Sequence, residues 1–506
     1  MRKIKNTIRI LVFAALLCGL LGVSGKVLEQ KDSENGLRPF LDSAEEYDVL
    51  FFGDSLVRYG VFPLELYHKY GIASYNLGSS NALIPMSYWR LVNALDYAAP
   101  KVVMMSVVEA EEESRITILG ERLHVLLGAF PMTLNKARAI LDLTESDGED
   151  ENGVAFSDIR RELFFPLRKY HSRWSDLTNE DFEPVLNAQK GAVPRVHVSD
   201  AGNALRPEGV YEPMPEKGDG YAYLRRIIET CRERDIQLVL YHPPGPLKEK
   251  KYKSLLRAEK IAEEYGVPMI NFTDMDHVID AHVDCADTGG HLNCSGVLKV
   301  TDYIGRYLAD HYSLPDRRQD AAYAHWDAQW DAYVDEKIRM IREEADSLRS
   351  RLALLHDDSF HVVLTVRPGF DYESDYIKEA LQNIARQHLY ENDDSVAENW
   401  NPLVSLDDAA DFNQGYMLIV DRDAQQEYEA VQEFYGIGEQ EFETSFGYVF
   451  CRMDGEWIDL SLTQADEEIY YFDSWEEQEE DMRLILIDRR TGKPALAMAF
   501  SCEAAE

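Results

Sequence analysis

Short apolar runs alternate with amphipathic stretches between residues 43 and 314. Such runs are typical of buried strands, whereas the stretches between them repeat apolar residues at helical spacing. The predicted strands are residues 49–52, 74–77, 101–107, 236–241 and 267–271. The predicted helices are residues 62–70, 85–97, 221–234, 254–265 and 296–311. This alternation predicts an α/β domain with a mostly parallel sheet, in which ligands bind beyond the carboxyl ends of the strands.

Beyond Leu314 the pattern changes. Residues 321–355 carry aromatic and aliphatic residues at helical spacing among many charges, which predicts one long amphipathic helix packed on a neighbouring domain. The tail contains five strand-like runs, HVVLTV, YMLIVDR, GYVFCRM, MRLILIDRR and ALAMAF, and a predicted helix at residues 375–387. These elements predict an α+β C-terminal domain. Its acidic stretch, residues 442–481, lacks the tightly spaced ligands of an EF-hand and is interpreted as a solvated face.

The N-terminus has the pattern of an export signal. Four basic residues precede residues 10–25, which contain no charge. This run is longer than a minimal signal-peptide core but shorter than the ~20 residues that span a bilayer comfortably. Because residues 23–25 form a weak cleavage site, we expect an uncleaved single-pass anchor with the bulk of the chain outside the membrane; a cleaved signal and a secreted protein is the alternative.

The chain of 506 residues is long enough for more than one core. We therefore expect a signal peptide or anchor at residues 1–30 and an α/β domain at residues 31–315 with a helical insertion at about 110–220. A linker helix at residues 316–356 and an acidic domain of unknown function at residues 357–506 follow.

Charge and cysteine content narrow the classes of partner and site. The chain has 52 basic and 91 acidic residues, a net charge of −39, which disfavours nucleic acid or an anionic membrane surface as a partner. Among the six cysteines, only Cys285 and Cys294 bracket a suggestive loop. A disulfide between them and two separate thiols both remain open, because spacing alone does not show whether their Cβ atoms meet.

Two segments carry the residues of a hydrolytic site. Gly53-Asp54-Ser55 follows the first predicted strand, where glycine permits a tight turn and the serine NH at a helix start can stabilise an oxyanion. Asp287 and His291 lie just before the last predicted helix, so the histidine can serve as a base and the carboxylate can hold its Nδ1 proton. A turn serine and a helix-capping histidine are the alternative interpretation.

The segments FFGDS, YNLGSSN and DTGGHLNCSGVLKVTDYIGRYL resemble the first, second and last sequence blocks of the SGNH/GDSL hydrolase family, over about residues 43–314. The resemblance implies a flavodoxin-like three-layer fold and acyl-ester hydrolysis or transfer through an acyl-serine, without a metal or another cofactor. It assigns Ser55 as the nucleophile, Gly78 as an oxyanion donor, His291 as the general base and Asp287 as its orienting acid.

The sequence departs from the family pattern in two places. Three residues, rather than two, separate Asp287 from His291, and the two glycines among them allow the loop to bulge. The family's Gly-x-Asn-Asp segment after the third strand is replaced by VVMMSVVEAEEE, so the second oxyanion donor is missing or comes from Ser106 or Asn81. Glu109 in that segment would repel negative charge.

The export signal and these departures make the chain similar to cell-envelope acyl-transfer accessory proteins. We therefore expect an acylated surface polysaccharide or other envelope polymer as the substrate, with a membrane acyltransferase as a partner. Five insertion residues, Phe164, Phe165, Leu167, Tyr170 and Trp174, are interpreted as core, and a platform for sugar rings is the alternative. His242 is interpreted as part of a structural loop rather than a substrate contact. The competing interpretation of the whole chain is a non-catalytic binding or scaffolding protein with a relic site.

Overall fold

The computed structural model describes residues 2–28, 36–110, 120–146, 148–150, 152–182, 189–199, 205–275, 278–345, 347–353, 355, 357–370, 378, 381, 404–411, 414–432, 438–454, 457–465, 467–473 and 481–500. The chain divides into two compact units. The first comprises Met1–Val193, Ala204–Asp274 and Gly305–Gln329, and the second comprises Pro194–Asn203, Met275–Ile304 and Trp330–Glu506. Each unit is described by itself.

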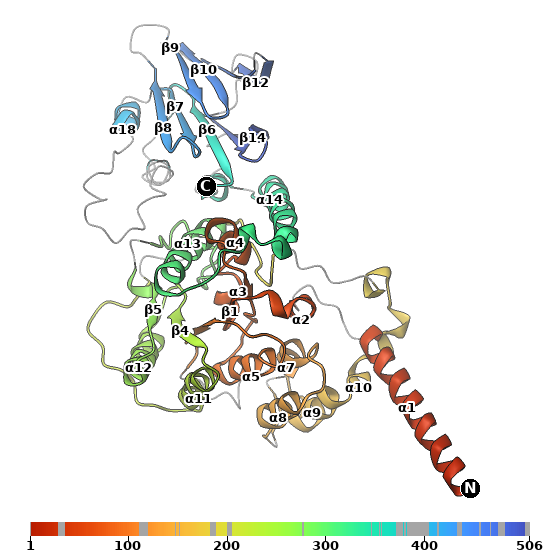
Figure 1. The fold of residues 1–506 in the computed structure, drawn as a ribbon. Helices are drawn as coiled ribbons and strands as arrows, with labels where there is room; N and C mark the ends of the chain where they lie inside the picture. The colour runs from red at the N-terminus through yellow and green to blue at the C-terminus, as the bar shows by residue number, and fades with distance from the viewer. Residues whose placement is uncertain are drawn as a thin grey trace. The chain divides into compact units, whose positions relative to one another are not determined.

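The first unit is built on a parallel sheet (Figure 1). Its strands are β1 (Val49–Phe52), β2 (Ser74–Asn76), β3 (Val102–Ser106), β4 (Gln237–His242) and β5 (Met269–Asn271). They lie in the order β2-β1-β3-β4-β5 and all neighbours are parallel. This is the strand order of flavodoxin-like doubly wound sheets. The structure confirms all five predicted strands, because runs buried on both faces are apolar throughout.

Helices cover both faces of this sheet. They include α2 (Leu37–Asp42), η1 (Ala44–Glu46), α3 (Ser55–Arg58), α4 (Pro63–Tyr70), α5 (Ile84–Ala94), α11 (Gly220–Glu233), α12 (Glu249–Tyr265) and η4 (Phe272–Asp274). A further helix, α13 (Cys294–His311), begins in the second unit and ends in the first. In Figure 1, α4 lies on one side of the strands, and α5, α11 and α12 lie on the other. The predicted helices are confirmed, although α12 begins at Glu249 rather than at residue 254.

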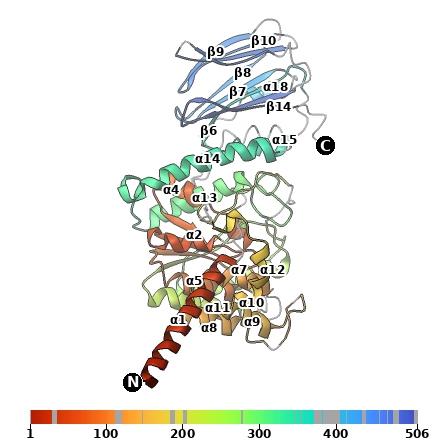
Figure 2. The same cartoon turned by 90° about the vertical axis from the view of Figure 1, so that its right-hand side faces the viewer.

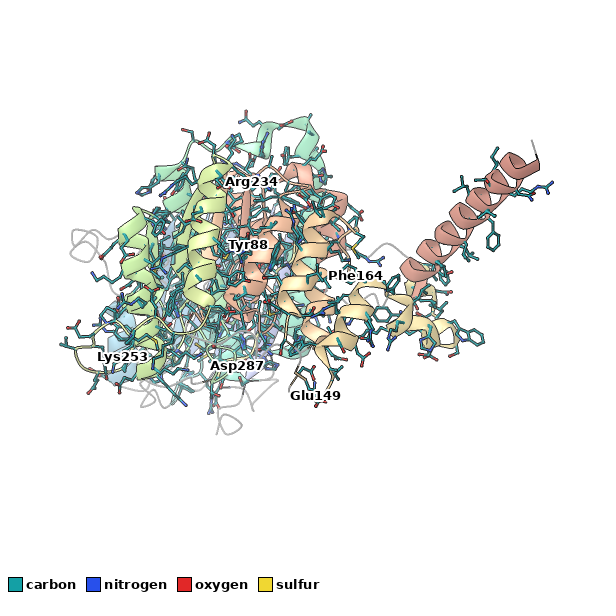
Figure 3. All side chains as sticks on the ribbon, turned by 90° about the horizontal axis from the view of Figure 1, so that it is seen from below. Tyr88, Glu149, Phe164, Arg234, Lys253 and Asp287 are labelled. Carbon is teal, nitrogen blue, oxygen red and sulfur yellow. The ribbon has the colours of Figure 1, made fainter. Side chains whose placement is uncertain are left out.

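Aromatic contacts join neighbouring helices of the first unit. Tyr88 of α5, which is labelled in Figure 3, packs edge-on against Tyr223 of α11 with ring centroids 5.5 Å apart. Arg226 of α11 stacks over both rings, at 5.1 Å and 4.7 Å from their centroids. The apolar faces of these helices therefore carry cation–π contacts as well as aliphatic packing.

The insertion forms short helices between β3 and α11. They are α7 (Gly120–Leu127), α8 (Leu134–Leu143), α9 (Phe156–Phe164), α10 (Leu167–Tyr170), η2 (His171–Ser175) and η3 (Asn179–Phe182). The expectation that all its aromatic residues are core is wrong: Phe165 is 71% and Trp174 is 72% exposed. Pro166 follows the end of α9, so one helical periodicity does not continue across the segment and the rings do not share one face.

The N-terminal helix α1 (Arg2–Leu28) exposes many large apolar side chains. They include Ile10, Leu11, Phe13, Leu16 and Leu20. Within the described part of the chain, no helix combines the length and hydropathy required to cross a membrane.

The predicted helix at residues 321–355 is interrupted. The structure has η5 (Arg317–Gln319), η6 (Ala321–Tyr323), α14 (Ala324–Glu344) and α15 (Leu348–Ala353). The Ser347 hydroxyl accepts a hydrogen bond from Ser350 N at 3.1 Å, so it caps the start of α15 and a new helix begins there. As expected for an aromatic stripe, Trp326 of α14 is fully buried, with its ring centroid 4.9 Å from that of Tyr67 on α4.

The C-terminal part of the second unit contains two antiparallel sheets. One has the order β14-β13-β6-β7-β8 and the other β12-β11-β10-β9. The strands are β6 (Phe360–Val366), β7 (Tyr416–Asp421), β8 (Gln426–Val431), β9 (Gly438–Thr444), β10 (Gly447–Asp454), β11 (Trp457–Gln464), β12 (Glu467–Asp473), β13 (Met482–Asp488) and β14 (Lys493–Phe500), with helix α18 (Val404–Asp411) before β7. Figure 2 shows the sheets as two stacked layers.

A common core joins the two sheets. Val363 and Ile485 come from one sheet, and Val449 and Leu460 come from the other. Much of the acidic stretch at residues 442–481 is therefore strand, which alternates between buried apolar side chains and polar ones, so only one of its faces is solvated. The helix expected at residues 375–387 lies for the most part outside the described residues.

Candidate active site

Ser55 lies at the carboxyl end of β1, as the first residue of the short helix α3. At Gly53, an added Cβ would lie 2.5 Å from Val57 Cγ2 and 2.6 Å from Ser106 Cβ, so only glycine fits between β1 and β3. Asp54 Oδ1 accepts a hydrogen bond from Leu56 N at 3.1 Å and caps α3. The Gly-Asp-Ser turn thus presents a half-buried Ser55 at the sheet edge where ligands of doubly wound folds bind.

Asn76, which sequence reasoning missed, fastens this turn to β2. Its amide Nδ2 donates to Val57 O at 2.8 Å and to Val61 O at 3.0 Å, and its Oδ1 accepts from Gly78 N at 2.9 Å. The side chain is 2% exposed. The backbone NH of Gly78, predicted as an oxyanion donor, is therefore engaged by Asn76. An asparagine at a strand end is the signal that could have found this contact.

The remaining candidate oxyanion donors lie in different surroundings. Asn81 is exposed and has a left-handed backbone, with φ of 56°. Ser106, at the end of β3, is 1% exposed, and its Oγ accepts a hydrogen bond from Val108 N at 3.3 Å. Asn81 is thus the more accessible side chain of the two.

Asp54, the neighbour of Ser55, is influenced by a second acidic group, Glu109. Burial and the nearby charge of Glu109 raise the pKa of Asp54 to about 7. Glu109 itself forms an ion pair with Lys251 of α12. The lysine offsets the negative charge that was expected to oppose an oxyanion, so this edge of the sheet is less unfavourable to negative charge than the sequence indicates.

Asp287 and His291 belong to the second unit and face each other across a tight turn. His291 Nδ1 lies 2.8 Å from Asp287 Oδ2. Gly290 has φ of 85°, and its NH donates to Asp287 O at 3.2 Å, which closes the turn. The backbones of Cys285 and Leu292 form an isolated antiparallel β-bridge, which pairs the two sides of the loop. The additional residue between the acid and the histidine is thus accommodated by a glycine in the left-handed region.

Further donors hold the Asp287 carboxylate, which is labelled in Figure 3. Its Oδ1 accepts from Gly289 N at 3.0 Å and from His291 N at 3.4 Å. Arg195 Nη1 lies 2.8 Å from Oδ2. Burial acts to raise the pKa of Asp287, but hydrogen bonds and charge from His291 and the backbone outweigh it and hold the pKa below its usual range.

A buried polar cluster supports the loop from α13. Asp284 is fully buried and accepts from Ser295 Oγ at 2.7 Å and from Lys299 Nζ at 2.7 Å. Breaking such a pair by removing one partner leaves an uncompensated buried charge, so the cluster fixes the loop relative to this helix. The two cysteines that bracket the loop, Cys285 and Cys294, are buried thiols in the structure.

His242, at the end of β4, is 3% exposed. Its Nδ1 lies 2.7 Å from Pro243 O and 3.3 Å from Thr273 Oγ1, and burial lowers its pKa to about 4. These contacts agree with the interpretation as part of a structural loop. Across the described residues, no group of three or more His, Cys, Asp or Glu side chains is arranged to hold a metal ion.

No protein-family model matches the chain, and no curated protein matches it in sequence. Among solved structures, the chain has 10% identity to "a putative acylhydrolase" from Bacteroides fragilis NCTC 9343, with a TM-score of 0.27 over 56% of this chain and 99% of that one. It also has 10% identity to an acetyl xylan esterase from the rumen bacterium Butyrivibrio proteoclasticus, with a TM-score of 0.21 over 53% of this chain and 64% of that one. Similarities at this level carry no argument about function.

Proposed function

We propose that the protein is an exported serine esterase or O-acyltransferase that acts on acyl esters of cell-envelope glycans through an acyl-serine intermediate. The observation that carries the proposal is the 2.8 Å contact between His291 Nδ1 and Asp287 Oδ2. Because an ionised carboxylate only accepts, this contact places a proton on Nδ1 and leaves the lone pair of the neutral ring on Nε2. This is the tautomer that a general base for a serine requires.

In the proposed reaction, Ser55 Oγ attacks the ester carbonyl carbon while His291 Nε2 accepts its proton. The tetrahedral intermediate collapses, the alcohol leaves with the proton from His291, and the acyl group remains on Ser55. Water then attacks the acyl-serine in hydrolysis, or a glycan hydroxyl attacks it in transfer.

The oxyanion is proposed to bind the backbone NH of Ser55 and of Gly78, with Asn81 as the third donor. Because Gly78 N already donates to Asn76 Oδ1 at 2.9 Å, it would have to divide its hydrogen between two acceptors. A shared donor stabilises the oxyanion less than an uncommitted one does. We therefore expect slow turnover of simple esters.

The export-type N-terminus supports an envelope substrate, since residues after the apolar run would lie outside the cytoplasm. The exposed rings of Phe165 and Trp174 support the alternative interpretation of the insertion as a surface that binds sugar rings. A membrane acyltransferase that supplies the acyl group is the proposed partner for transfer.

Labelling with a fluorophosphonate probe tests the proposal. We expect the probe to modify Ser55, and we expect Ser55→Ala to abolish labelling and to lower hydrolysis of a small acetyl ester by about a thousandfold or more. Ser80→Ala removes a hydroxyl from the nearby loop after β2 and should change neither readout. A native protein that is not labelled alongside a labelled control esterase would favour the binding or scaffolding role.

A further inference from the structure

One segment of the insertion, residues 194–199, is hydrogen-bonded to both ends of the Asp287–His291 loop. Cys294 N donates to Arg195 O at 2.7 Å, and Ser199 N donates to Cys285 O at 2.9 Å. Val196, between these two contacts, is 2% exposed and anchors the segment. All of these residues belong to the second unit. The insertion therefore contributes directly to the loop that carries the candidate base.

Arg195 extends this connection to the carboxylate itself. Its Nη1 lies 2.8 Å from Asp287 Oδ2, the same oxygen that lies 2.8 Å from His291 Nδ1. The other oxygen, Oδ1, is occupied by the backbone donors of the turn. Donors thus engage both oxygens, and one of them receives a guanidinium and an imidazole together.

We infer that Arg195 is a positioning residue for the Asp287–His291 pair, which fixes the carboxylate and competes with the imidazole for its negative charge. Its effect on turnover rests on the proposed function, whereas its effect on the histidine does not. A fixed positive charge on the shared oxygen disfavours a second charge on the ring. The arginine from the insertion and the imidazole of His291 therefore share one carboxylate oxygen and its negative charge.

The buried ion pair beside the loop differs from Arg195 in its effect. Asp284 and Lys299 support the loop from α13 as an ion pair 2.7 Å apart, so their charges largely cancel. Asp287 faces His291 from its own loop, and Arg195 faces Asp287 from the neighbouring segment. The side chain of Arg195 is 33% exposed, which lets the position be substituted without opening a core cavity.

Nuclear magnetic resonance of the full chain with ¹⁵N-labelled histidine tests the inference without any activity assay. The His291 signals are assigned by their loss in His291→Gln. In Arg195→Gln we expect the midpoint of the His291 titration to move to higher pH by about 0.5 to 1 unit, as expected for losing a charge roughly 5 Å away near a protein surface. Arg195→Lys retains the charge, so its His291 midpoint should lie close to that of the native protein.

Arg206→Gln is the matched control, because Arg206 forms a similar partly exposed pair with Asp274 at 3.0 Å in the first unit. It should leave the His291 titration unchanged. An unchanged midpoint in Arg195→Gln, in a protein that unfolds at the native temperature, would overturn the inference.

Activity provides the second readout. The acid limb of the pH profile of kcat/KM should move to higher pH in Arg195→Gln, and the substitution should have no further effect on activity in an Asp287→Asn background. A shifted titration in a chain that hydrolyses no ester would leave the inference standing and remove the proposed function. An active enzyme whose His291 titration is unchanged in Arg195→Gln would support the proposed function and overturn the inference.

Discussion

At the scale of single residues, the best-defined group is the Asp287 carboxylate. Two backbone NH groups, an arginine and a histidine all lie within hydrogen-bond distance of its two oxygens. This number of donors favours the ionised form and leaves the carboxylate one orientation.

Asp287→Asn should lower turnover of a small acetyl ester by about 10² to 10⁴-fold while Ser55 remains reactive. The amide cannot hold the Nδ1 proton as a carboxylate does, and it cannot stabilise the imidazolium that forms in the reaction. Initial rates and thermal unfolding of the two proteins provide the comparison. Native activity in the Asn variant would indicate a Ser-His dyad instead.

Asp54 gives a second prediction at this scale, on stability. Its pKa is raised from 3.8 to about 7 in the folded protein, so the folded state binds the additional proton between about pH 4 and 7. Stability from this group is fully present below pH 4 and is lost as the pH rises through 7, by at most about 4 kcal/mol.

Asp54→Asn removes this dependence and retains an oxygen that can cap α3. The unfolding temperature of the variant, measured against that of the native protein, should therefore rise between pH 4 and pH 8. Calorimetry at both pH values gives the comparison. An offset that is the same at both would show that Asp54 is ionised in the folded state throughout this range.

At the scale of elements, the break between α9 and α10 decides what the insertion exposes. Pro166 ends the helical repeat, and Trp174 in η2 is left 72% exposed. Its neighbour Arg173 donates two hydrogen bonds, from Nη1 to Leu28 O of α1 at 2.7 Å and from Nη2 to Asp181 Oδ1 at 2.9 Å. These contacts hold the segment that carries the ring.

Trp174→Ala should raise KM for an acylated polysaccharide by about two- to tenfold, because an aromatic contact contributes about 0.5 to 1.5 kcal/mol. Turnover of a small acetyl ester should not change, since the ring is proposed to bind the polymer and not the acyl group. Tyr448→Ala, which removes an exposed ring from β10, is the control. Equal effects on both substrates would argue for a structural role of Trp174.

At the scale of the whole molecule, the N-terminal helix stands apart in composition. The chain as a whole has a net charge of −39. In α1, by contrast, large apolar side chains follow several basic residues and are exposed. Exposed apolar side chains at this density favour transfer to a lipid environment.

We therefore expect the full-length protein to remain with membranes after washing in alkaline carbonate. Immunoblotting of pellet and supernatant, with N-terminal sequencing of the recovered chain, provides the measurement. Recovery in the soluble fraction of a mature chain that begins near Lys26 would show instead that the segment is a cleaved signal.

The strands and helices of the first unit follow from the sequence because they depend on local periodicity. A strand buried on both faces must be apolar, and a helix on a sheet must repeat its apolar residues, wherever the rest of the chain lies. The Asp287–His291 pair could be predicted from the sequence for the same reason, since both residues lie on one short turn. Local pattern misled where a single residue interrupts it, as at Pro166 and at Ser347.

The contacts that adjust the candidate site were decided only by the tertiary structure. Arg195 and Asp287 are 92 residues apart, and Glu109 and Lys251 are 142 residues apart. The amide Nδ2 of Asn76 donates to carbonyls in and after α3, which fixes the side chain, and its Oδ1 accepts from Gly78 N. Periodicity carries no information about such pairs, because a charged or amide side chain satisfies the pattern of its own element equally well with water or with a distant partner.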